Sequence, residues 1–195
     1  MFSEYLQRKD NIIIAAIDIL DEYGMQGMTT KEIARRQKIT EPAIYKQFSG
    51  KKEIMQTIIE RFKEFDQSVF NTISEQKLEP EKGLEFFLNT YAEYFQNYPQ
   101  ISTLMLSFDT FRFDPEIDSL MKERHLARKE ILVKLLKDAD IPAEEGAEII
   151  MGILWSATYN WRLANESYVL KDKLEKMIKI FANNWFTNSY EGRSV

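Results

Sequence analysis

The chain has 195 residues, of which 44% are hydrophobic and 29% are charged, a composition typical of globular proteins rather than of disordered or membrane proteins. It has no cysteine, which excludes disulfides, thiol nucleophiles and cysteine-ligated zinc, and its one histidine excludes a centre of several histidines. The net charge is −5, yet residues 1–52 carry nine Lys or Arg against seven Asp or Glu. Because residues 53–195 carry more acidic than basic side chains, we expect only the N-terminal part to approach a nucleic acid.

The N-terminus lacks the basic stretch and apolar run of a signal peptide, and the most apolar early run, residues 12–20, is interrupted by Asp18. We therefore expect a cytoplasmic chain that does not associate with a membrane. Only seven glycines and five prolines occur, which favours long helices over a turn-rich β fold.

The first predicted helix covers residues 8–23. Its apolar residues follow the i, i+3, i+4, i+7 spacing of an amphipathic helix and are Ile13, Ala16, Ile17 and Leu20. Gly24 follows and suits a helix C-cap with positive φ.

Two short helices are predicted next, joined by residues 37–39. Thr29 and Glu32 have the spacing of a capping box and begin a helix that ends near residue 36. Thr40 is a suitable N-cap and Pro42 is tolerated in a first turn, so a third helix is expected over residues 40–47. Two short helices across a three-residue turn predict a helix-turn-helix motif.

The rest of the chain also predicts helices and no strand. The expected segments are residues 51–76, 81–97, 101–108, 115–139, 142–165 and 170–188, several of them delimited by proline. The predicted fold is all-α with about nine helices. A three-helix DNA-binding domain is expected over residues 1–52, and a helical ligand-binding and dimerisation domain over residues 53–195.

The third helix has the side chains that a recognition helix needs. Ala43 is small enough to enter the major groove, and hydrogen-bond donors flank it at Thr40, Tyr45 and Lys46. Lys51 begins the next helix, where a cation and backbone N–H groups can hold one phosphate together.

Residues 28–54 closely resemble the DNA-binding domain of TetR-family regulators. The family pattern begins with a threonine cap and an Ile-Ala pair, which are Thr29, Ile33 and Ala34 in this chain. It continues with a Val/Ile-Ser/Thr step, a Tyr-x-x-Phe motif and a lysine, which are Ile39 with Thr40, Tyr45 with Phe48, and Lys51. The resemblance covers about residues 8–60. Two departures occur: Lys38 stands where the family usually has glycine, and the acidic residue after Lys51 is displaced by one position, to Glu53.

The resemblance decides between two interpretations of several side chains. Tyr45 and Phe48 at helical spacing are by themselves typical of a core, but the family pattern implies that Phe48 is buried and Tyr45 contacts phosphate. A run of basic residues is usually a solvated face, but beside this motif we expect at least one of Lys31, Arg35, Arg36 and Lys38 to contact phosphate. Glu41 is interpreted first as a charge favoured by the helix dipole. The candidate DNA-contacting residues are Thr29, Lys31, Thr40, Glu41, Pro42, Ala43, Tyr45, Lys46 and Lys51.

The resemblance also implies an effector cavity behind the DNA-binding domain. The candidate lining residues are mostly aromatic and come from four predicted elements: Phe62, Phe65, Phe87, Tyr91, Met105, Phe108, Trp155 and Tyr159. They predict a small hydrophobic or aromatic effector and no metal or cofactor. The alternative is that any of them, including Trp155, is plain core. No phosphate loop, nucleophile elbow or dinucleotide fingerprint occurs, so an enzyme is not indicated.

Residues 149–157 are apolar on nearly every side and contain the small residues Gly152 and Ser156. A helix of this kind must be covered all round, either by its own bundle or by a second subunit. The resemblance implies a homodimer formed through the last two long helices. The predicted function is a homodimeric repressor released from a DNA operator by its effector. The alternative is a DNA-bound helical scaffold that holds a protein partner and has no small-molecule effector.

Overall fold

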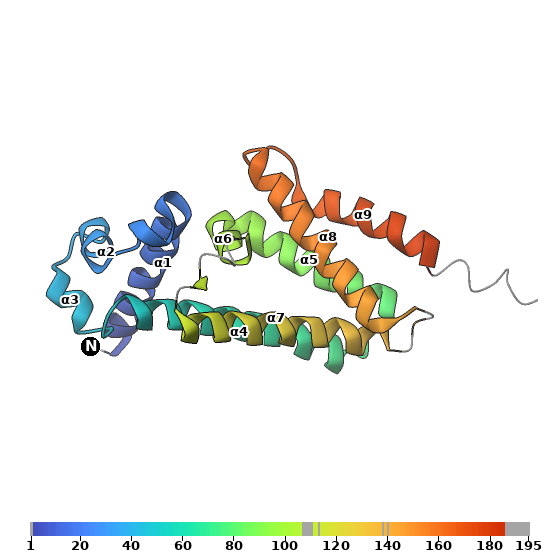
Figure 1. The fold of residues 1–195 in the computed structure, drawn as a ribbon, viewed down its shortest axis with the longest axis horizontal. Coiled ribbons are helices and arrows are strands. Elements are labelled where there is room, and N and C mark those ends of the chain that lie inside the picture. Colours follow the sequence, from blue (N-terminus) through green and yellow to red (C-terminus); the bar gives the residue numbers. More distant parts are fainter. Residues whose placement is uncertain (1, 107–110, 113, 138, 140, 186–195) are drawn as a thin grey trace, which may run out of the picture. The chain divides into compact units, whose positions relative to one another are not determined.

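The computed structural model describes residues 2–106, 111–112, 114–137, 139 and 141–185. Over these residues it is all-α, as predicted (Figure 1). The helices are α1 (Phe2–Gly27), α2 (Thr30–Arg36), α3 (Glu41–Tyr45), α4 (Lys51–Glu75), α5 (Pro80–Asn97), the 3-10 helix η1 (Pro99–Ile101), α6 (Ser102–Leu106), α7 (Pro115–Leu136), α8 (Ala143–Leu163) and α9 (Leu170–Trp185).

Helix α1 begins at Phe2, earlier than the predicted start at residue 8. Gly24 lies where a helix break was predicted and has φ 65 and ψ −172, a conformation that glycine adopts without steric cost. Helical hydrogen bonding resumes for one more turn beyond it, so α1 ends at Gly27.

The turn between α2 and α3 depends on a residue with positive φ. Lys38 has φ 55, and around it the Ile39 N–H donates to the Ala34 carbonyl at 3.0 Å, which closes the C-terminus of α2. The lysine thus lies in the left-handed region at a position where the family usually has glycine, at a cost of about 1–2 kcal/mol for an L-residue. The turn keeps its geometry because the packing on either side of it supplies that energy.

The backbone forms two compact units. The first contains residues 1–64 and 103–122, and the second contains residues 65–102 and 123–195. Helices α4 and α7 each contribute residues to both units. The predicted boundary after residue 52 lies inside α4, and the assignment of functions to either side of that boundary stays a prediction.

Each unit buries its own apolar residues. In the first unit, each of the three helices and the segment after α3 contributes a residue that is at most 1% exposed. These residues are Ile12 on α1, Ile33 on α2, Ile44 on α3 and Phe48 after α3. In the second unit, helix α5 packs on α9 and α8, and its Phe87, Tyr91 and Phe95 are equally buried. Burial of each large apolar side chain contributes roughly 1.5–3 kcal/mol, so these contacts hold the short helices in place.

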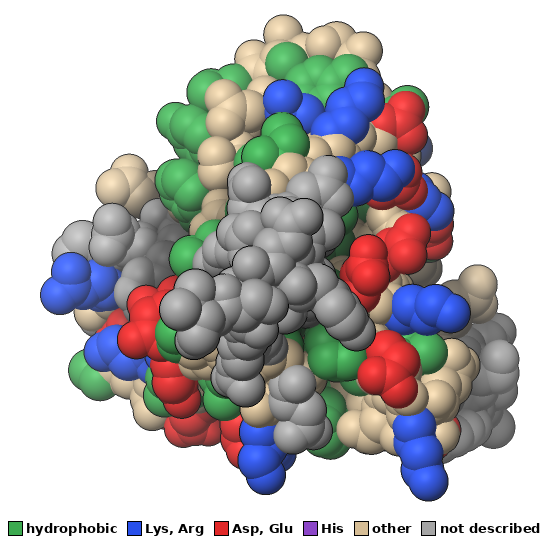
Figure 2. Space-filling view, turned by 90° about the vertical axis from the view of Figure 1, so that its right-hand side faces the viewer, with side chains coloured by type: hydrophobic (Ala, Val, Ile, Leu, Met, Phe, Trp, Pro, Cys, Tyr) green, Lys and Arg blue, Asp and Glu red, His purple; other side chains and the backbone are tan. Residues whose placement is uncertain are grey.

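The surface carries charges of both signs. Acidic and basic side chains are interspersed with hydrophobic ones on the face drawn in Figure 2. Within the described part of the chain, no helix is both long and apolar enough to cross a membrane.

Candidate functional site

Helices α2 and α3 pack against each other and present the candidate DNA-contacting residues. The Thr29 hydroxyl caps α2 by accepting a hydrogen bond from the Glu32 N–H at 3.1 Å. The Glu32 carboxylate instead accepts from Arg35 at 2.8 and 2.6 Å. The threonine half of the predicted capping box therefore forms, while the glutamate is used by an ion pair on the helix surface.

Most of the candidate DNA-contacting side chains are accessible. Exposed ones are Thr29, Lys31, Thr40, Pro42, Tyr45 and Lys46, whereas Glu41, Ala43 and Lys51 are half-buried. Tyr45 is 54% exposed, and Phe48, three residues later, is 1% exposed. This difference agrees with the division of roles that the family resemblance implied, although the DNA contacts themselves stay predictions.

A hydroxyl that sequence reasoning did not single out links the two helices. Thr30 donates to Glu41 at 2.6 Å, and its oxygen lies 3.4 Å from the Tyr45 hydroxyl. The bond to Thr30 connects the first turn of α2 to the first turn of α3. Glu41 therefore holds the recognition helix in position, in addition to any favourable interaction with the helix dipole.

Lys51 is placed differently from the sequence expectation. Its ammonium group donates to the carbonyl of Met25, near the end of α1, and burial lowers its pKa. A phosphate contact by Lys51 stays a prediction, and it requires the ammonium group to leave this carbonyl. The side chain thus has a structural partner within the first unit.

The cations of the helix-turn-helix divide into two groups. Arg35 pairs with Glu32, and Arg36 pairs with Glu22 at 2.7 and 2.8 Å. In the described part of the chain, no ion pair engages Lys31, Lys38 or Lys46. These three lysines are therefore the cations that can approach phosphate without first breaking an intramolecular pair.

The candidate effector residues do not share one environment. Phe65, Phe87 and Tyr91 lie together in the second unit, with Phe65 edge-on to Tyr91 at 5.2 Å between centroids and Phe87 at 4.7 Å from the same ring. The first unit contains Phe62, which is buried, and Met105, which is half-buried. Phe108 lies outside the described residues.

The remaining two candidates, Trp155 and Tyr159, lie at the surface. They stack on each other along α8 with centroids 5.2 Å apart and are 46% and 42% exposed. Their apolar surface is therefore open to solvent in the single chain, rather than enclosed in the second unit.

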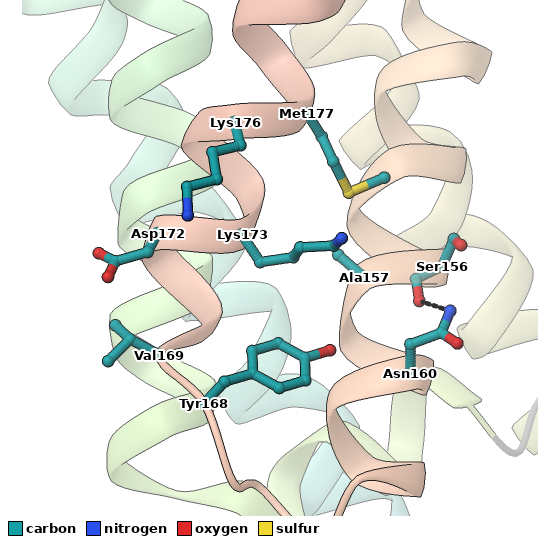
Figure 3. Close-up of a pocket in the computed structure, with 9 residues that line it drawn as sticks. All are labelled: Ser156, Ala157, Asn160, Tyr168, Val169, Asp172, Lys173, Lys176 and Met177. Carbon is teal, nitrogen blue, oxygen red and sulfur yellow. Dashed lines mark hydrogen bonds between the residues drawn. The ribbon is translucent and has the colours of Figure 1, made fainter.

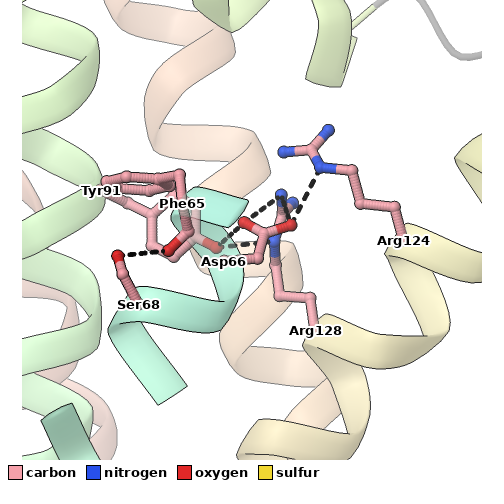
Figure 4. A network of polar contacts seen from close by, with 6 residues as sticks. All are labelled: Phe65, Asp66, Ser68, Tyr91, Arg124 and Arg128. Atoms are coloured by element: carbon pink, nitrogen blue, oxygen red, sulfur yellow. Dashed lines mark hydrogen bonds and ion pairs between the residues drawn. The ribbon is translucent and has the colours of Figure 1, made fainter. Parts of the chain in front are cut away.

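A buried polar cluster adjoins the aromatic group of the second unit (Figure 4). Asp66 on α4 accepts from Arg124 Nε at 2.9 Å and from Arg128 Nη2 at 3.0 and 3.1 Å, both on α7. Tyr91 on α5 donates to Asp66 and accepts from Arg128 Nε at 3.0 Å. The four residues, here called the Asp66 cluster, join three helices.

Charges are present in the Asp66 cluster despite its burial. Asp66 is 3% exposed, and Arg124 and Arg128 are each 5% exposed. Burial and the neighbouring Arg128 lower the pKa of Arg124 to about 10, so it keeps its charge at neutral pH. A buried ion cluster is rarely more stabilising than apolar side chains of the same volume. Sequence reasoning missed it because Arg124 and Arg128, four residues apart, resemble an exposed helix face.

The last two helices leave part of their surface uncovered. On α8 the exposed apolar side chains are Ile149, Trp155, Tyr159 and Leu163, between 41% and 63% exposed. Gly152 lies among them, and a Cβ added there would meet no atom within 4 Å. A half-open groove of about 730 Å³ runs between α8 and α9 and is lined by Ser156, Ala157, Asn160, Tyr168, Val169, Asp172, Lys173, Lys176 and Met177 (Figure 3).

A short helix with exposed polar side chains, set across a tight turn from a second helix, defines a helix-turn-helix DNA-binding protein. Residues 12–58 match the family model for bacterial regulatory proteins of the tetR family. The helix-turn-helix of this chain is therefore a DNA-binding domain of the tetR type, and the chain is a DNA-binding transcriptional regulator.

Individual relatives match different lengths of the chain. The nucleoid occlusion factor SlmA of Aliivibrio fischeri is 26% identical over 145 residues, which cover 71% of this chain and 74% of that protein. The class G tetracycline repressor protein of Vibrio anguillarum is 35% identical over 52 residues, 27% of this chain and 25% of that protein. A transcriptional regulator from Aquifex aeolicus has a TM-score of 0.72 and 26% identity, covering 89% of this chain and 98% of that chain.

Proposed function

We propose that the protein is a homodimeric repressor that a small, largely hydrophobic or aromatic effector releases from its operator. Two recognition helices enter successive major grooves on one side of a duplex only when they lie roughly 34–36 Å apart. An effector that changes this separation in the dimer would weaken operator binding. Dimerisation is therefore the first requirement of the proposal.

The observation that carries the proposal is the uncovered apolar surface of α8 and α9. Ile149 and Leu163 on α8 and Ile180 on α9 are 41%, 63% and 67% exposed, together with the stacked Trp155 and Tyr159. Large apolar surfaces of this kind mark interaction sites on soluble proteins. Gly152 lies on the same side of α8 and permits the close approach of a second helix. A second copy placed here would bury these side chains in a two-fold interface.

The support for an effector is the aromatic group around Tyr91. Phe65 stacks on Tyr94 with ring centroids 4.0 Å apart and meets Tyr91 edge-on, so several aromatic rings pack together beside the Asp66 cluster. Apolar walls with a few fixed polar groups are the usual composition of small-molecule sites. The exposed position of Trp155 and Tyr159 favours a role for these two in self-association.

A second candidate function is a DNA-bound scaffold that holds a protein partner. The observation that favours it is the length of the similarity to the nucleoid occlusion factor, 145 residues, against 52 residues for the tetracycline repressor. The longer similarity includes helices outside the helix-turn-helix. A scaffold needs no effector, so an effector screen distinguishes the two candidates.

Dimerisation is tested with Gly152→Leu. The new side chain meets no atom of its own chain at Cβ, and leucine favours a helix over glycine by roughly 0.5–1 kcal/mol, so the fold should be kept. A second subunit would collide with it. In sedimentation velocity we expect a dimer for the wild type, a monomer for Gly152→Leu, and a dimer for the control Ala127→Leu on the exposed side of α7. A monomeric wild type at micromolar concentration contradicts the proposal.

The effector is tested by thermal shift with saturated fatty acids and planar aromatic dyes as probes. A ligand at a hundred times its dissociation constant stabilises the native state by about 2.7 kcal/mol, which raises the melting temperature by several degrees. The same probe should release an operator duplex selected from a random pool. If no probe shifts the melting temperature and a lysate protein is retained by the DNA-bound regulator instead, the scaffold function is favoured.

A further inference from the structure

The groove between α8 and α9 is lined by apolar side chains, such as Ala157, Val169 and Met177, and by two lysines. Lys173 and Lys176 line it from α9 and are exposed, and Lys173 reaches across it toward α8 (Figure 3). In the described part of the chain neither lysine makes an ion pair, although Asp172 lines the same groove. The neighbouring Lys171, by contrast, pairs with Glu93 at 2.8 Å.

An exposed acidic residue lies on the same side of α8. Glu145 is in the first turn of α8, seven residues before Gly152 and therefore two turns away on the same helix face. It is exposed, and within the described residues no ion pair engages it. Its neighbours Glu144 and Glu148 differ, because both pair with Lys129 at 2.8 and 2.7 Å.

We propose that the groove receives the first turn of α8 from a second copy of the chain, with the partner's Glu145 seated against Lys173 and Lys176. This inference rests on the proposed homodimer and specifies how its two copies recognise each other. The apolar side chains of α8 and α9 supply the buried area, and the ion pairs select the axial alignment of the helices.

The symmetry of a homodimer brings these charges together. Helix α9 runs back along α8 after the short connection that follows Leu163, and the two helices pack on each other (Figure 1). A two-fold axis across α8, midway between Gly152 and Ser156, reverses the partner helix and makes it parallel to α9. It also places the partner's Glu145 level with Leu163, the end of α8 at which α9 begins. Lys173 lies one turn into α9, so a lysine and a glutamate side chain can meet there.

The alignment is specified twice, because two-fold symmetry repeats every contact. A displacement of one copy by a helical turn, about 5.4 Å, would keep much of the apolar contact but would separate both pairs of charges. Apolar surfaces give little directional preference, whereas complementary charges fix the register of an interface. Lys173 is nearer than Lys176 to the expected position of the carboxylate of the partner's Glu145. Reversing the charge of Lys173 should therefore weaken the dimer more than reversing the charge of Lys176.

The test is a charge exchange measured by sedimentation equilibrium. Lys173→Glu and Glu145→Lys each create like charges across the interface and should weaken the dimer by about tenfold or more. The double variant Lys173→Glu/Glu145→Lys has the wild-type net charge and should recover most of the affinity. An equimolar mixture of the two single variants should form a heterodimer, because one copy then carries two acidic and the other two basic side chains, so that both pairs across the interface join opposite charges.

Lys179→Glu is the matched control, because it makes the same charge change on α9 outside the groove and should leave the dissociation constant unchanged. Circular dichroism melting of every variant separates lost association from lost folding. Single reversals that leave the dimer intact, or a double variant that stays dissociated, overturn the inference while the homodimer stands. An intact dimer in which Lys173→Glu abolishes a thermal shift by sulfate would assign the groove to a free anion and also overturn it. A monomeric wild type removes the inference and the proposed homodimer together.

Discussion

Replacement of Asp66 by asparagine is the sharpest test of the second unit. The change keeps the size of the side chain but removes the negative charge that both arginines contact. Arg124 Nε lies 2.9 Å and Arg128 Nη2 lies 3.0 Å from its oxygens, and all three residues are at most 5% exposed. Removing one partner of a buried ion pair costs about 3–5 kcal/mol, because the remaining charge cannot be hydrated.

The magnitude can be compared with a milder change in the same cluster. Tyr91→Phe removes a hydroxyl that bonds Asp66 and Arg128, but those two stay in contact with each other, so about 1–3 kcal/mol is expected. Glu60→Gln is the control, an exposed carboxylate on the same helix, and should leave the free energy of unfolding unchanged.

The free energy of unfolding is measured by urea titration followed by circular dichroism, at one protein concentration because dimerisation contributes to stability. The expected order of destabilisation is Asp66→Asn, then Tyr91→Phe, then Glu60→Gln. A loss of less than about 1 kcal/mol for Asp66→Asn, well below the usual cost of breaking a buried ion pair, would refute the assignment of the Asp66 cluster as buried and charged.

Three further predictions concern the DNA-binding part. Lys38→Gly should stabilise the protein by about 0.5–1 kcal/mol, because the relief of the positive φ exceeds the entropy cost of glycine, and a lower melting temperature would contradict this. Thr29→Ala should destabilise it by about 1 kcal/mol through loss of the helix cap, whereas Thr29→Ser should not. Tyr45→Phe should weaken binding to all operator sequences equally, because the hydroxyl is predicted to contact phosphate. Lys51→Ala should lower the slope of log affinity against log salt concentration by about one, measured by fluorescence anisotropy. An unchanged slope would show that Lys51 stays on the Met25 carbonyl when DNA binds.

The helix-turn-helix could be predicted from sequence because its information is local. The cap at Thr29, the start of α3 after Thr40 and the positive φ at Lys38 each depend on residues within a few positions of each other. Helix caps and tight turns are determined by short-range hydrogen bonds and sterics, which a linear pattern records. The same holds for the amphipathic periodicity that predicted the all-α class.

The sequence could not show which polar side chains the fold would bury or satisfy. Lys51 contacts a carbonyl 26 residues away, and Arg128 contacts a carboxylate 62 residues away. Trp155 and Tyr159, which a linear pattern could not distinguish from core, lie on an exposed face of α8.

By itself, the sequence of this protein determined the helices, the turn and the family of its DNA-binding domain. Only the tertiary structure decided that Asp66, Tyr91, Arg124 and Arg128 meet, and that α8 and α9 leave an apolar and basic face uncovered. The physical reason is that helix formation depends on neighbours three or four residues apart, whereas burial and charge pairing depend on which helix faces pack together.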